Sequence, residues 1–373
     1  MDADYEMIET EDALHLLVAR LRNEPCIALD TEFFWERTFY ARLGLVQIGI
    51  RDESYFLVDP LRIGCLAALG EILANPRITK ILHDAPQDLM ILKRVTDTTI
   101  RNVFDTRLAA GFTGLSSTIS LQNLIAEQFD VHLPKGHTRS NWLARPLDSK
   151  QLAYAVDDVR FLIRLFDDLR KKAKDSGVER WMNAELATLD HPDAYQEKAP
   201  EEQYLRLSVG SSLSPRGVAV LRELAAWREE TARATDKPRR QIADDAVLIS
   251  MADLLPRKHG ELRLCQKLDT RTVKRYGNDL VAAVKRGLDV PEDELPVKRK
   301  RPNVRRLGKE RVNSAVEEIN RRATQWRIDP QIVASKSAVA LLLTEGRSAS
   351  PEDHRLIRGW RSELMGDALD TII

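Results

Sequence analysis

The strongest constraint on the fold of this chain is a change in hydrophobic periodicity near residue 190. Before it, short apolar runs of strand length alternate with stretches of helical spacing. Strands are predicted at 25–33, 42–50, 54–60 and 79–84. Helices are predicted at 9–21, 65–74, 85–95, 118–130 and 149–173. Three close strands followed by strand–helix units indicate a mixed sheet with helices on its faces.

The second half of the chain has helical patterns only. Periodicity fades from 191 to 212, which predicts a linker. The helical stretch that follows begins at Ser214-Pro215, a favourable helix start. The segment 290–311 contains prolines and many basic residues, so a second linker is expected there. "IDPQIVASKSAVALLL" in the tail echoes "KPRRQIADDAVLISMA", which hints at a duplicated helical module.

Length and composition narrow the class of protein. A chain of 373 residues exceeds one compact core, so two or three domains are expected. No apolar run is long enough for a membrane span, and the acidic N-terminus is unlike a signal peptide. Cys26, Cys65 and Cys265 are far apart and form no CxxC pair, which predicts reduced core cysteines. These observations favour a cytoplasmic protein without membrane attachment.

Charge is distributed unevenly although the formal net charge is zero. Residues 1–200 contain 24 Lys and Arg against 31 Asp and Glu, while residues 201–373 contain 33 against 26. An acidic half joined to a basic half suits a metal-dependent site followed by a module for a polyanion. The alternative is that both halves simply have well-solvated surfaces.

Two carboxylates end the first long strand. In "CIALDTEFF" the side chains of Asp30 and Glu32 are two residues apart, so they share one face of the strand. Alone, such a pair is most often a solvated strand end or half of an ion pair. Buried side by side without partners, two like charges are costly.

Two further acidic positions follow in the first half. Asp88 in "HDAPQDL" is predicted in the first turn of a helix, and Asp84 competes with it for the same role. Tyr154 and Asp158 in "YAVDD" are four residues apart on one helical face, with Asp157 as the competing acid. Asp148 and Gln151 predict a capping box at the start of that helix.

Four converging carboxylates cannot all be ionised without cations. Hard oxygen ligands in that number suit Mg²⁺ or Mn²⁺. Two such ions can activate a water and stabilise the leaving oxygen of a phosphodiester. The sequence therefore predicts a site for two divalent metal ions formed by Asp30, Glu32, Asp88 and Asp158.

The three motifs DTEF, HDAPQDL and YAVDD resemble those of the DEDDy 3′→5′ exonucleases. The segment "KGHTRSNWLARPLDSKQLAYAVDD" resembles the ribonuclease D family specifically. Residues 213–290 are similar to the helicase-and-RNase-D C-terminal (HRDC) domain, although Ala243 stands where many HRDC sequences have a large apolar residue. The tail fits a diverged second copy.

The resemblance implies a ribonuclease H-like α/β exonuclease domain followed by all-α HRDC-type domains. The expected divisions are an exonuclease domain (1–195), a linker (196–212), an HRDC domain (213–292), a basic linker (293–309) and an HRDC-like domain (310–373). It also implies that the four acids ligate the metals. Tyr154 would orient and help deprotonate the attacking water, with most activation coming from the metal because a phenol has a pKa near 10.

Substrate contacts are predicted around these motifs. Phe33, or its neighbour Phe34, would stack on the terminal base. His83 and Gln87 flank Asp88 and are candidates for contact with the 3′-terminal nucleotide, or for support of the acids. A mixture of cations and an aromatic ring in the loop before Tyr154 suits a phosphate path: Lys135, Arg139 and Trp142.

These features together predict a metal-dependent exoribonuclease that releases 5′-mononucleotides from RNA 3′ ends. The resemblance implies trimming of tRNA precursors with 3′ extensions, by a monomeric enzyme. The same chemistry on DNA is one alternative. A non-catalytic nucleic-acid-binding protein on an inherited nuclease fold is the other, and the intact set of four acids and Tyr154 disfavours it.

Overall fold

The computed structural model describes residues 4–134, 140–195, 197–207, 213–296 and 308–373. The predicted contacts Lys135 and Arg139 lie outside these residues. The chain divides into two compact units. The first combines Met1–Phe33, Leu43–Gln196 and Arg301–Ile373, and the second combines Phe34–Arg42 and Glu197–Lys300. Each unit is described by itself.

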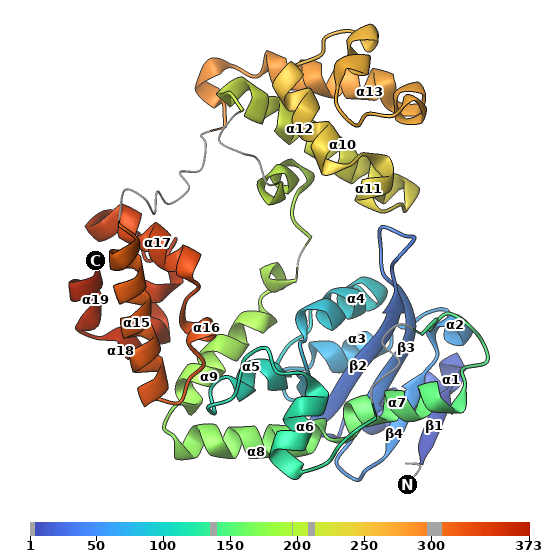
Figure 1. The fold of residues 1–373 in the computed structure, drawn as a ribbon. Coiled ribbons are helices and arrows are strands. Elements are labelled where there is room, and N and C mark those ends of the chain that lie inside the picture. Colours follow the sequence, from blue (N-terminus) through green and yellow to red (C-terminus); the bar gives the residue numbers. More distant parts are fainter. Residues whose placement is uncertain (1–3, 135–139, 196, 208–212, 297–307) are drawn as a thin grey trace. The chain divides into compact units, whose positions relative to one another are not determined.

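A six-stranded mixed sheet forms the centre of the first unit (Figure 1). Its strand order is β1-β4-β3-β2-β5-β6. The strands are β1 (Tyr5–Ile8), β2 (Cys26–Phe34), β3 (Arg42–Gly49), β4 (Tyr55–Val58), β5 (Thr79–Leu82) and β6 (Val103–Asp105). The pairs β1–β4, β2–β5 and β5–β6 are parallel, whereas β3 and β4 are antiparallel. The mixed sheet predicted from the sequence is therefore confirmed.

The helices of this part of the unit include those predicted at 9–21, 85–95 and 118–130, whereas the stretch predicted at 149–173 is divided at Phe161. The helices are α1 (Glu11–Leu21), α2 (Pro60–Ile63), α3 (Leu69–Ala74), α4 (Pro86–Thr96), α5 (Thr106–Ala110), α6 (Leu121–Phe129), α7 (Ser149–Arg160), α8 (Leu162–Asp175) and α9 (Glu179–Leu186). Helix α7 lies across one face of the sheet (Figure 1). The helix predicted at 65–74 begins only at Leu69, because residues 64–66 have no helical structure and 67–68 form a turn.

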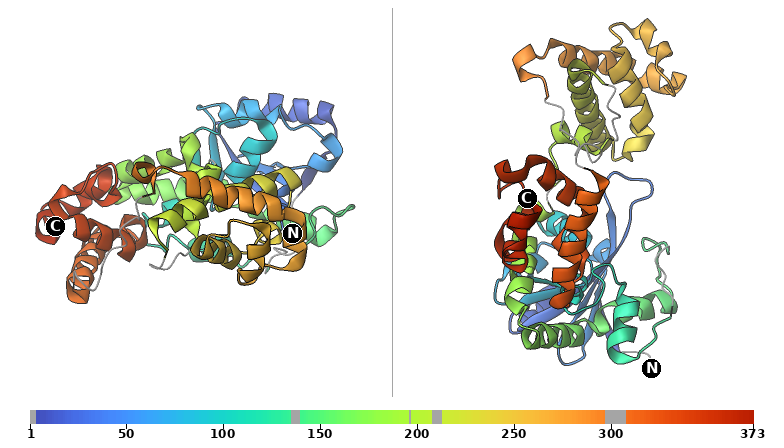
Figure 2. Two further views of the ribbon diagram at one scale, coloured as in Figure 1. Left: turned by 90° about the horizontal axis from the view of Figure 1, so that it is seen from above. Right: turned by 60° about the vertical axis from the view of Figure 1, so that its left-hand side comes forward.

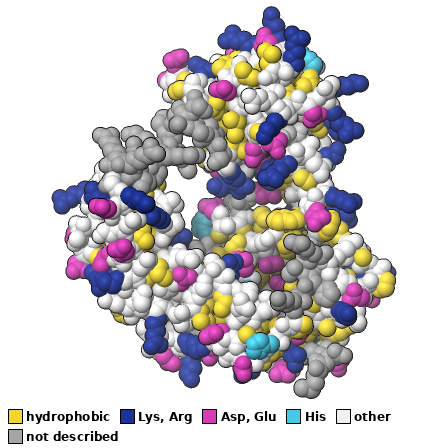
Figure 3. Space-filling view, viewed as in Figure 1, with side chains coloured by type: hydrophobic (Ala, Val, Ile, Leu, Met, Phe, Trp, Pro, Cys, Tyr) yellow, Lys and Arg dark blue, Asp and Glu magenta, His cyan; other side chains and the backbone are white. Residues whose placement is uncertain are grey.

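The second unit is helical. It contains α10 (Pro215–Thr235), α11 (Arg239–Ile242), α12 (Asp245–Leu254), α13 (Thr270–Asp289) and a 3₁₀ turn (His259–Leu264). Ser214 caps α10 with its side chain and Pro215 occupies the first turn, as the sequence predicts. The predicted linker 191–212 is not structureless, since 3₁₀ helices form at Pro192–Ala194 and Pro200–Arg206. Lys and Arg side chains are numerous on the surface around α10–α13 (Figure 3).

The C-terminal helices form a small bundle that belongs to the first unit (Figure 2). They are α15 (Lys309–Gln325), α16 (Pro330–Val333), α17 (Lys336–Glu345), α18 (Gly359–Met365) and α19 (Ala368–Ile372). The order of a long helix, a four-residue helix and a capped ten-residue helix repeats that of α10, α11 and α12. This order supports the predicted duplication.

Buried contacts attach the C-terminal bundle to α9. Glu185 on α9 accepts hydrogen bonds from both Nη atoms of Arg361 at 2.7 and 3.0 Å and from Trp360 Nε1 at 2.9 Å. Trp181 packs edge-on against Trp326 and stacks with Trp360. The bundle is therefore held by a buried ion pair set among aromatic rings.

The cysteines and the helices test two expectations from composition. All three cysteines are free, but only Cys26 and Cys265 are buried. The prediction of a core position for Cys65 is wrong, because this residue lies in the exposed connection before α3. Among the described helices, none combines the length and apolar character that crossing a bilayer requires.

Candidate active site

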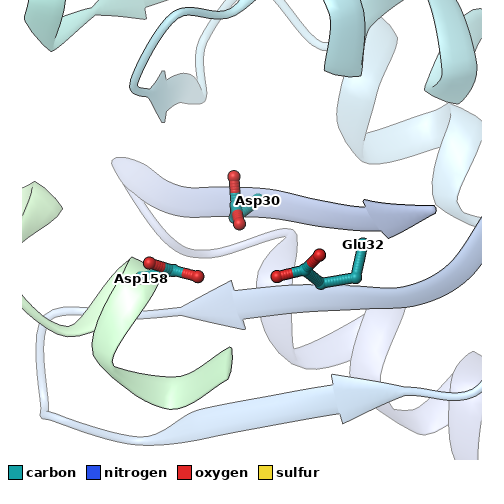
Figure 4. A group of neighbouring side chains, drawn as sticks. All are labelled: Asp30, Glu32 and Asp158. Atoms are coloured by element: carbon teal, nitrogen blue, oxygen red, sulfur yellow. The ribbon is translucent and has the colours of Figure 1, made fainter. Parts of the chain in front are cut away.

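Strand β2 delivers the first two carboxylates. Its first four residues are buried, and the alternation of a strand places Asp30 and Glu32 on one face. Carboxylate oxygens of Asp30, Glu32 and Asp158 all lie within 4.8 Å of one another. Figure 4 shows the three side chains converging from β2 and α7. The predicted convergence of the first and third motifs is therefore present.

Helix α7 brings the third motif to this point. Its start is fixed by the predicted capping box, in which Asp148 and Gln151 bond each other's backbone N–H groups at 2.8 and 3.1 Å. Tyr154 and Asp158 share a helical face, and the phenol lowers the pKa of the Asp158 carboxylate as a nearby hydrogen-bond donor. The helix thus presents an acid and a hydroxyl side by side.

Asp88 lies beside this group of three. It occupies the first turn of α4, as predicted, and is buried. The hydroxyl of Thr31, which lies between the two acids of β2, donates a hydrogen bond to the Asp88 carboxylate. Asp88 raises the pKa of Asp30 through its negative charge, so the fourth acid acts electrostatically on the cluster.

Burial and mutual repulsion shift the pKa of every acid upward. Burial, followed by the charges of Asp158 and Asp88, raises the pKa of Glu32 to about 9. Burial likewise raises the pKa of Asp158 to about 8 and that of Asp88 to about 7. The pKa of Asp30 rises well above its usual value, again mainly through burial. Bound divalent cations would stabilise the ionised form of these carboxylates.

The competing acids have other partners. Asp84 forms an ion pair with Arg107, and its side chain is 61% exposed. Asp157 lies 3.8 Å from Arg160. Asp157 does not belong to the group of three carboxylates that contains Asp158, and Asp84, unlike the buried Asp88, has an exposed side chain.

The predicted contacts around Asp88 have mixed surroundings. Phe33 and Gln87 are half-buried at the end of β2 and the start of α4. His83 Nε2 donates to the carbonyl of Ile119 at 3.0 Å, and Nδ1 lies 2.9 Å from Thr106 Oγ1. Both ring nitrogens are therefore engaged with protein atoms. Burial lowers the pKa of His83, which keeps the ring neutral.

Trp142, predicted with Lys135 and Arg139 to form a phosphate path, is enclosed by the protein. Its side chain is 1% exposed, and its ring packs 6.2 Å from that of Tyr154, centroid to centroid. Its backbone lies against Gly44, where an added Cβ would come within 2.6 Å of the Trp142 carbonyl oxygen. Because the ring is enclosed, the structure gives Trp142 a packing role behind Tyr154.

A cavity of about 330 Å³ opens onto the acids. Its lining includes Asp30, Tyr154, Asp158 and the segment 118–122. The lining also contains Arg107, which sequence reasoning missed because no motif marks a single arginine in a short helix. Thr31 was missed for a similar reason, although its place between Asp30 and Glu32 was the available signal.

Comparison with known proteins agrees with this geometry. Residues 5–174 match the family described as 3′-5′ exonuclease, and residues 218–284 match the HRDC domain. Ribonuclease D of Desulfotalea psychrophila is 37% identical over 361 residues, covering 97% of this chain and 96% of that protein. Ribonuclease D of Escherichia coli is 32% identical over 378 residues, covering 99% and 98%.

A solved structure extends the likeness to the whole fold. The crystal structure of Escherichia coli RNase D, described as an exoribonuclease involved in structured RNA processing, has a TM-score of 0.87. It is 31% identical and covers 99% of this chain and 98% of that one. Sequence and fold agree over nearly the full length, so this chain belongs to the ribonuclease D family of 3′→5′ exoribonucleases.

Proposed function

We propose that this exoribonuclease trims the 3′ extensions of tRNA precursors and releases 5′-mononucleotides with two divalent ions, Mg²⁺ or Mn²⁺. The observation that carries the proposal is the group formed by Asp30, Glu32 and Asp158, with Tyr154 beside Asp158. The Escherichia coli relative acts in structured RNA processing, and tRNA precursors are structured RNAs with 3′ extensions.

The acidic donor set fits divalent ions. Asp30, Glu32 and Asp158 offer hard oxygen atoms within 4.8 Å of one another, and Asp88 adds a fourth carboxylate beside them. When bound, the ions would lower the pKa of water and stabilise charge on the leaving oxygen. The proposed ligands are these four residues.

Tyr154 acts in this proposal as a neutral phenol. Burial and the neighbouring acids raise its pKa above the ordinary value, so the hydroxyl keeps its proton at neutral pH. The hydroxyl is a donor toward the Asp158 carboxylate, and in this proposal the phenol oxygen also accepts from the attacking water and orients it. Tyr154 therefore positions the water and does not remove its proton.

The remaining contacts extend the proposal to the RNA strand. Phe33 is proposed to stack on the terminal base, and Gln87 to contact the terminal nucleotide. Lys135 and Arg139 are proposed to bind the backbone before the site. We further propose that the HRDC-type domains grip the structured part of the RNA, and that the enzyme works as a cytoplasmic monomer.

The decisive experiment follows product release from a 3′-extended tRNA with Mg²⁺, with Mn²⁺ and with a chelator. Asp30→Asn should abolish metal-dependent shortening, because one ligand loses its charge. Tyr154→Phe should lower kcat by about 100-fold or more, which is the loss expected when a group that positions the reacting water is removed. RNA affinity should change little. Asp157→Asn is the matched control, since this acid lies outside the group of three.

A single-stranded DNA of the same sequence is the competing substrate. Stepwise shortening of the tRNA that requires metal and Asp30, with DNA degraded more slowly, supports the proposal. Wild-type turnover in Tyr154→Phe would contradict the role of the phenol. Binding without shortening under either metal would point instead to a protein that only binds nucleic acid.

A further inference from the structure

The cavity at the active site has one guanidinium in its wall. Among the described lining residues, Arg107 is the one Lys or Arg, and it faces a space shared with Asp30, Tyr154 and Asp158. His83 also lines the cavity, but burial lowers its pKa and keeps it neutral. A polyanion entering this acidic space therefore meets a single fixed positive charge among these residues.

Arg107 is held in place through its backbone. It lies in the first turn of α5, and its N–H donates to Asp105 Oδ1 at 2.9 Å. Its side chain is 27% exposed. Among the described residues, the buried Nε atom has no hydrogen-bond partner. The backbone of Arg107 is thus fixed, while part of the donor capacity of its guanidinium is unused.

The partner of this guanidinium is easily replaced. Asp84 pairs with Arg107, yet the Asp84 side chain is 61% exposed. Ion pairs with such an exposed partner contribute little to stability. The backbone of Asp84 is in the left-handed region, with φ at 64°, where a residue other than glycine is uncommon. An exposed carboxylate held at this point resembles the oxygens of a phosphate in charge and geometry.

A phosphate is a better ligand for the guanidinium than Asp84. The planar fork of arginine binds two oxygens of a phosphate at once, and charged hydrogen bonds of this kind are the strong ones. The 3′-terminal nucleotide of an RNA ends in a hydroxyl, so every phosphate beyond the scissile one lies on its 5′ side. A second phosphate near the acids must therefore belong to the strand that remains after cleavage.

We propose that Arg107 binds a phosphate of the RNA on the 5′ side of the scissile bond, and that Asp84 occupies the guanidinium when no RNA is present. This inference rests on the proposed action on RNA 3′ ends. In this inference Arg107 contacts the RNA strand that remains after cleavage, and the phosphate of that strand displaces Asp84 from the guanidinium.

The test compares Arg107→Gln with wild type on a single-stranded RNA and on a set of RNAs with one methylphosphonate each, placed at successive linkages 5′ of the scissile bond. In wild type, neutralising the contacted linkage should raise KM about tenfold, as expected for one charged hydrogen bond. Arg107→Gln should show the same rise on unmodified RNA and no further rise at that linkage. The RNA affinity of Arg107→Gln should fall less steeply with salt concentration than that of wild type, by the amount expected for about one phosphate contact.

Two variants separate this contact from a structural effect. Arg101→Gln removes an exposed arginine outside the cavity lining and should leave every KM value as in wild type. Asp84→Asn keeps a residue tolerated in the left-handed region and frees the guanidinium, so KM should stay equal or fall two- to threefold. If Asp84→Asn instead raised KM as Arg107→Gln does, the ion pair itself would be the functional unit and the proposal would be wrong.

The proposal is also overturned if the methylphosphonate pattern is the same in Arg107→Gln and wild type. Fluorescence anisotropy of the same RNAs in chelator repeats the comparison without turnover. A wild-type enzyme that binds these RNAs but shortens none of them would refute the proposed function, while the binding pattern would still decide the role of Arg107.

Discussion

At the scale of single residues, the acids of the site have raised pKa values, so metal binding is coupled to proton release. Burial and like charges raise the pKa of Glu32 to about 9 and that of Asp158 to about 8. In unfolded chains such acids ionise near pH 4. Metal-free protein therefore carries protons on these groups at neutral pH, and metal must displace them.

This proton uptake makes the stability of the metal-free protein depend on pH. The native state binds more protons than the unfolded state between about pH 5 and 9, so the free energy of unfolding should fall as pH rises through that window. Thermal unfolding in chelator at pH 6 and pH 9 measures the effect. Glu32→Gln should flatten the dependence, and Mg²⁺ should raise the melting temperature most at the alkaline end. An equal slope in wild type and Glu32→Gln would contradict this prediction.

Gln47 on β3 is a second unusual residue. It is fully buried, and neither Oε1 nor Nε2 has a hydrogen-bond partner among the described residues. An unpaired buried amide costs about 1–3 kcal/mol. Gln47→Leu should therefore increase the free energy of unfolding in chelator by about that amount, measured by urea titration.

Gln203 provides the control for Gln47. It is also buried, but its Nε2 donates to the carbonyl of Lys198 at 2.9 Å. Gln203→Leu should destabilise by about 1 kcal/mol, because a bond is lost. A loss of stability in Gln47→Leu would mean that an internal water bonds the amide.

At the scale of elements, one carboxylate organises the starts of two helices. Asp105 is buried and accepts the N–H groups of Asp84 at 3.1 Å and Ala85 at 3.0 Å. It also accepts those of Arg107 and Leu108 at the start of α5. The turn that leads into Asp88 and the helix that carries Arg107 therefore share a single anchor.

Removing this anchor should affect both stability and the site. Asp105→Ala leaves four backbone N–H groups without their acceptor, so a loss of about 2–3 kcal/mol is expected, together with weaker metal binding. Urea unfolding and calorimetric titration with Mn²⁺ measure the two effects. Thr10→Ala removes a single exposed cap bond of α1 and should cost about 1 kcal/mol without changing metal affinity. Unchanged metal affinity in Asp105→Ala would separate the anchor from the site.

The sequence predicts long, periodic elements better than short ones. Strand β2, the starts of α4, α7 and α10 and the mixed sheet follow from local patterns. Strand β1 buries only its last residue and β6 has only three residues, so neither shows a clear apolar pattern, unlike the largely buried four-residue strands β4 and β5. Both β1 and β6 are stabilised by pairing with distant strands. Trp142 reads as a loop aromatic, yet packing against Tyr154 encloses it, and no local pattern carries that information.

At the scale of the whole molecule, the C-terminal bundle depends on a buried charge. Burial alone would raise the pKa of Glu185, but hydrogen bonds and charge from Arg361 outweigh it and lower the pKa to about 2. Asp329 adds a second attachment, since it accepts from Ser117 N–H at 2.6 Å and donates its own N–H to the carbonyl of Gly111. Ser117, which directly precedes the segment lining the active-site cavity, is thus tied to the bundle.

Breaking the buried pair should loosen the bundle. Glu185→Gln leaves the Arg361 charge uncompensated, so the free energy of unfolding should fall by about 3–5 kcal/mol. Unfolding monitored by the fluorescence of the surrounding tryptophans measures this loss. In wild type this contribution should persist at neutral pH and disappear only as pH falls from about 4 towards 2. Glu363→Gln removes the more exposed acid bonded to Trp181 and should lower stability far less than Glu185→Gln. Equal losses in the two variants would refute the role of burial.

The assignment of residues near both ends of the chain to one unit has a consequence for synthesis on the ribosome. The aromatic contact between Trp181 and Trp360 joins one segment to another that is synthesised much later. Domains generally form in the order of translation, but this one cannot be completed until the intervening helical unit has emerged. During synthesis, α9 therefore stays uncovered until the C-terminal bundle has left the exit tunnel.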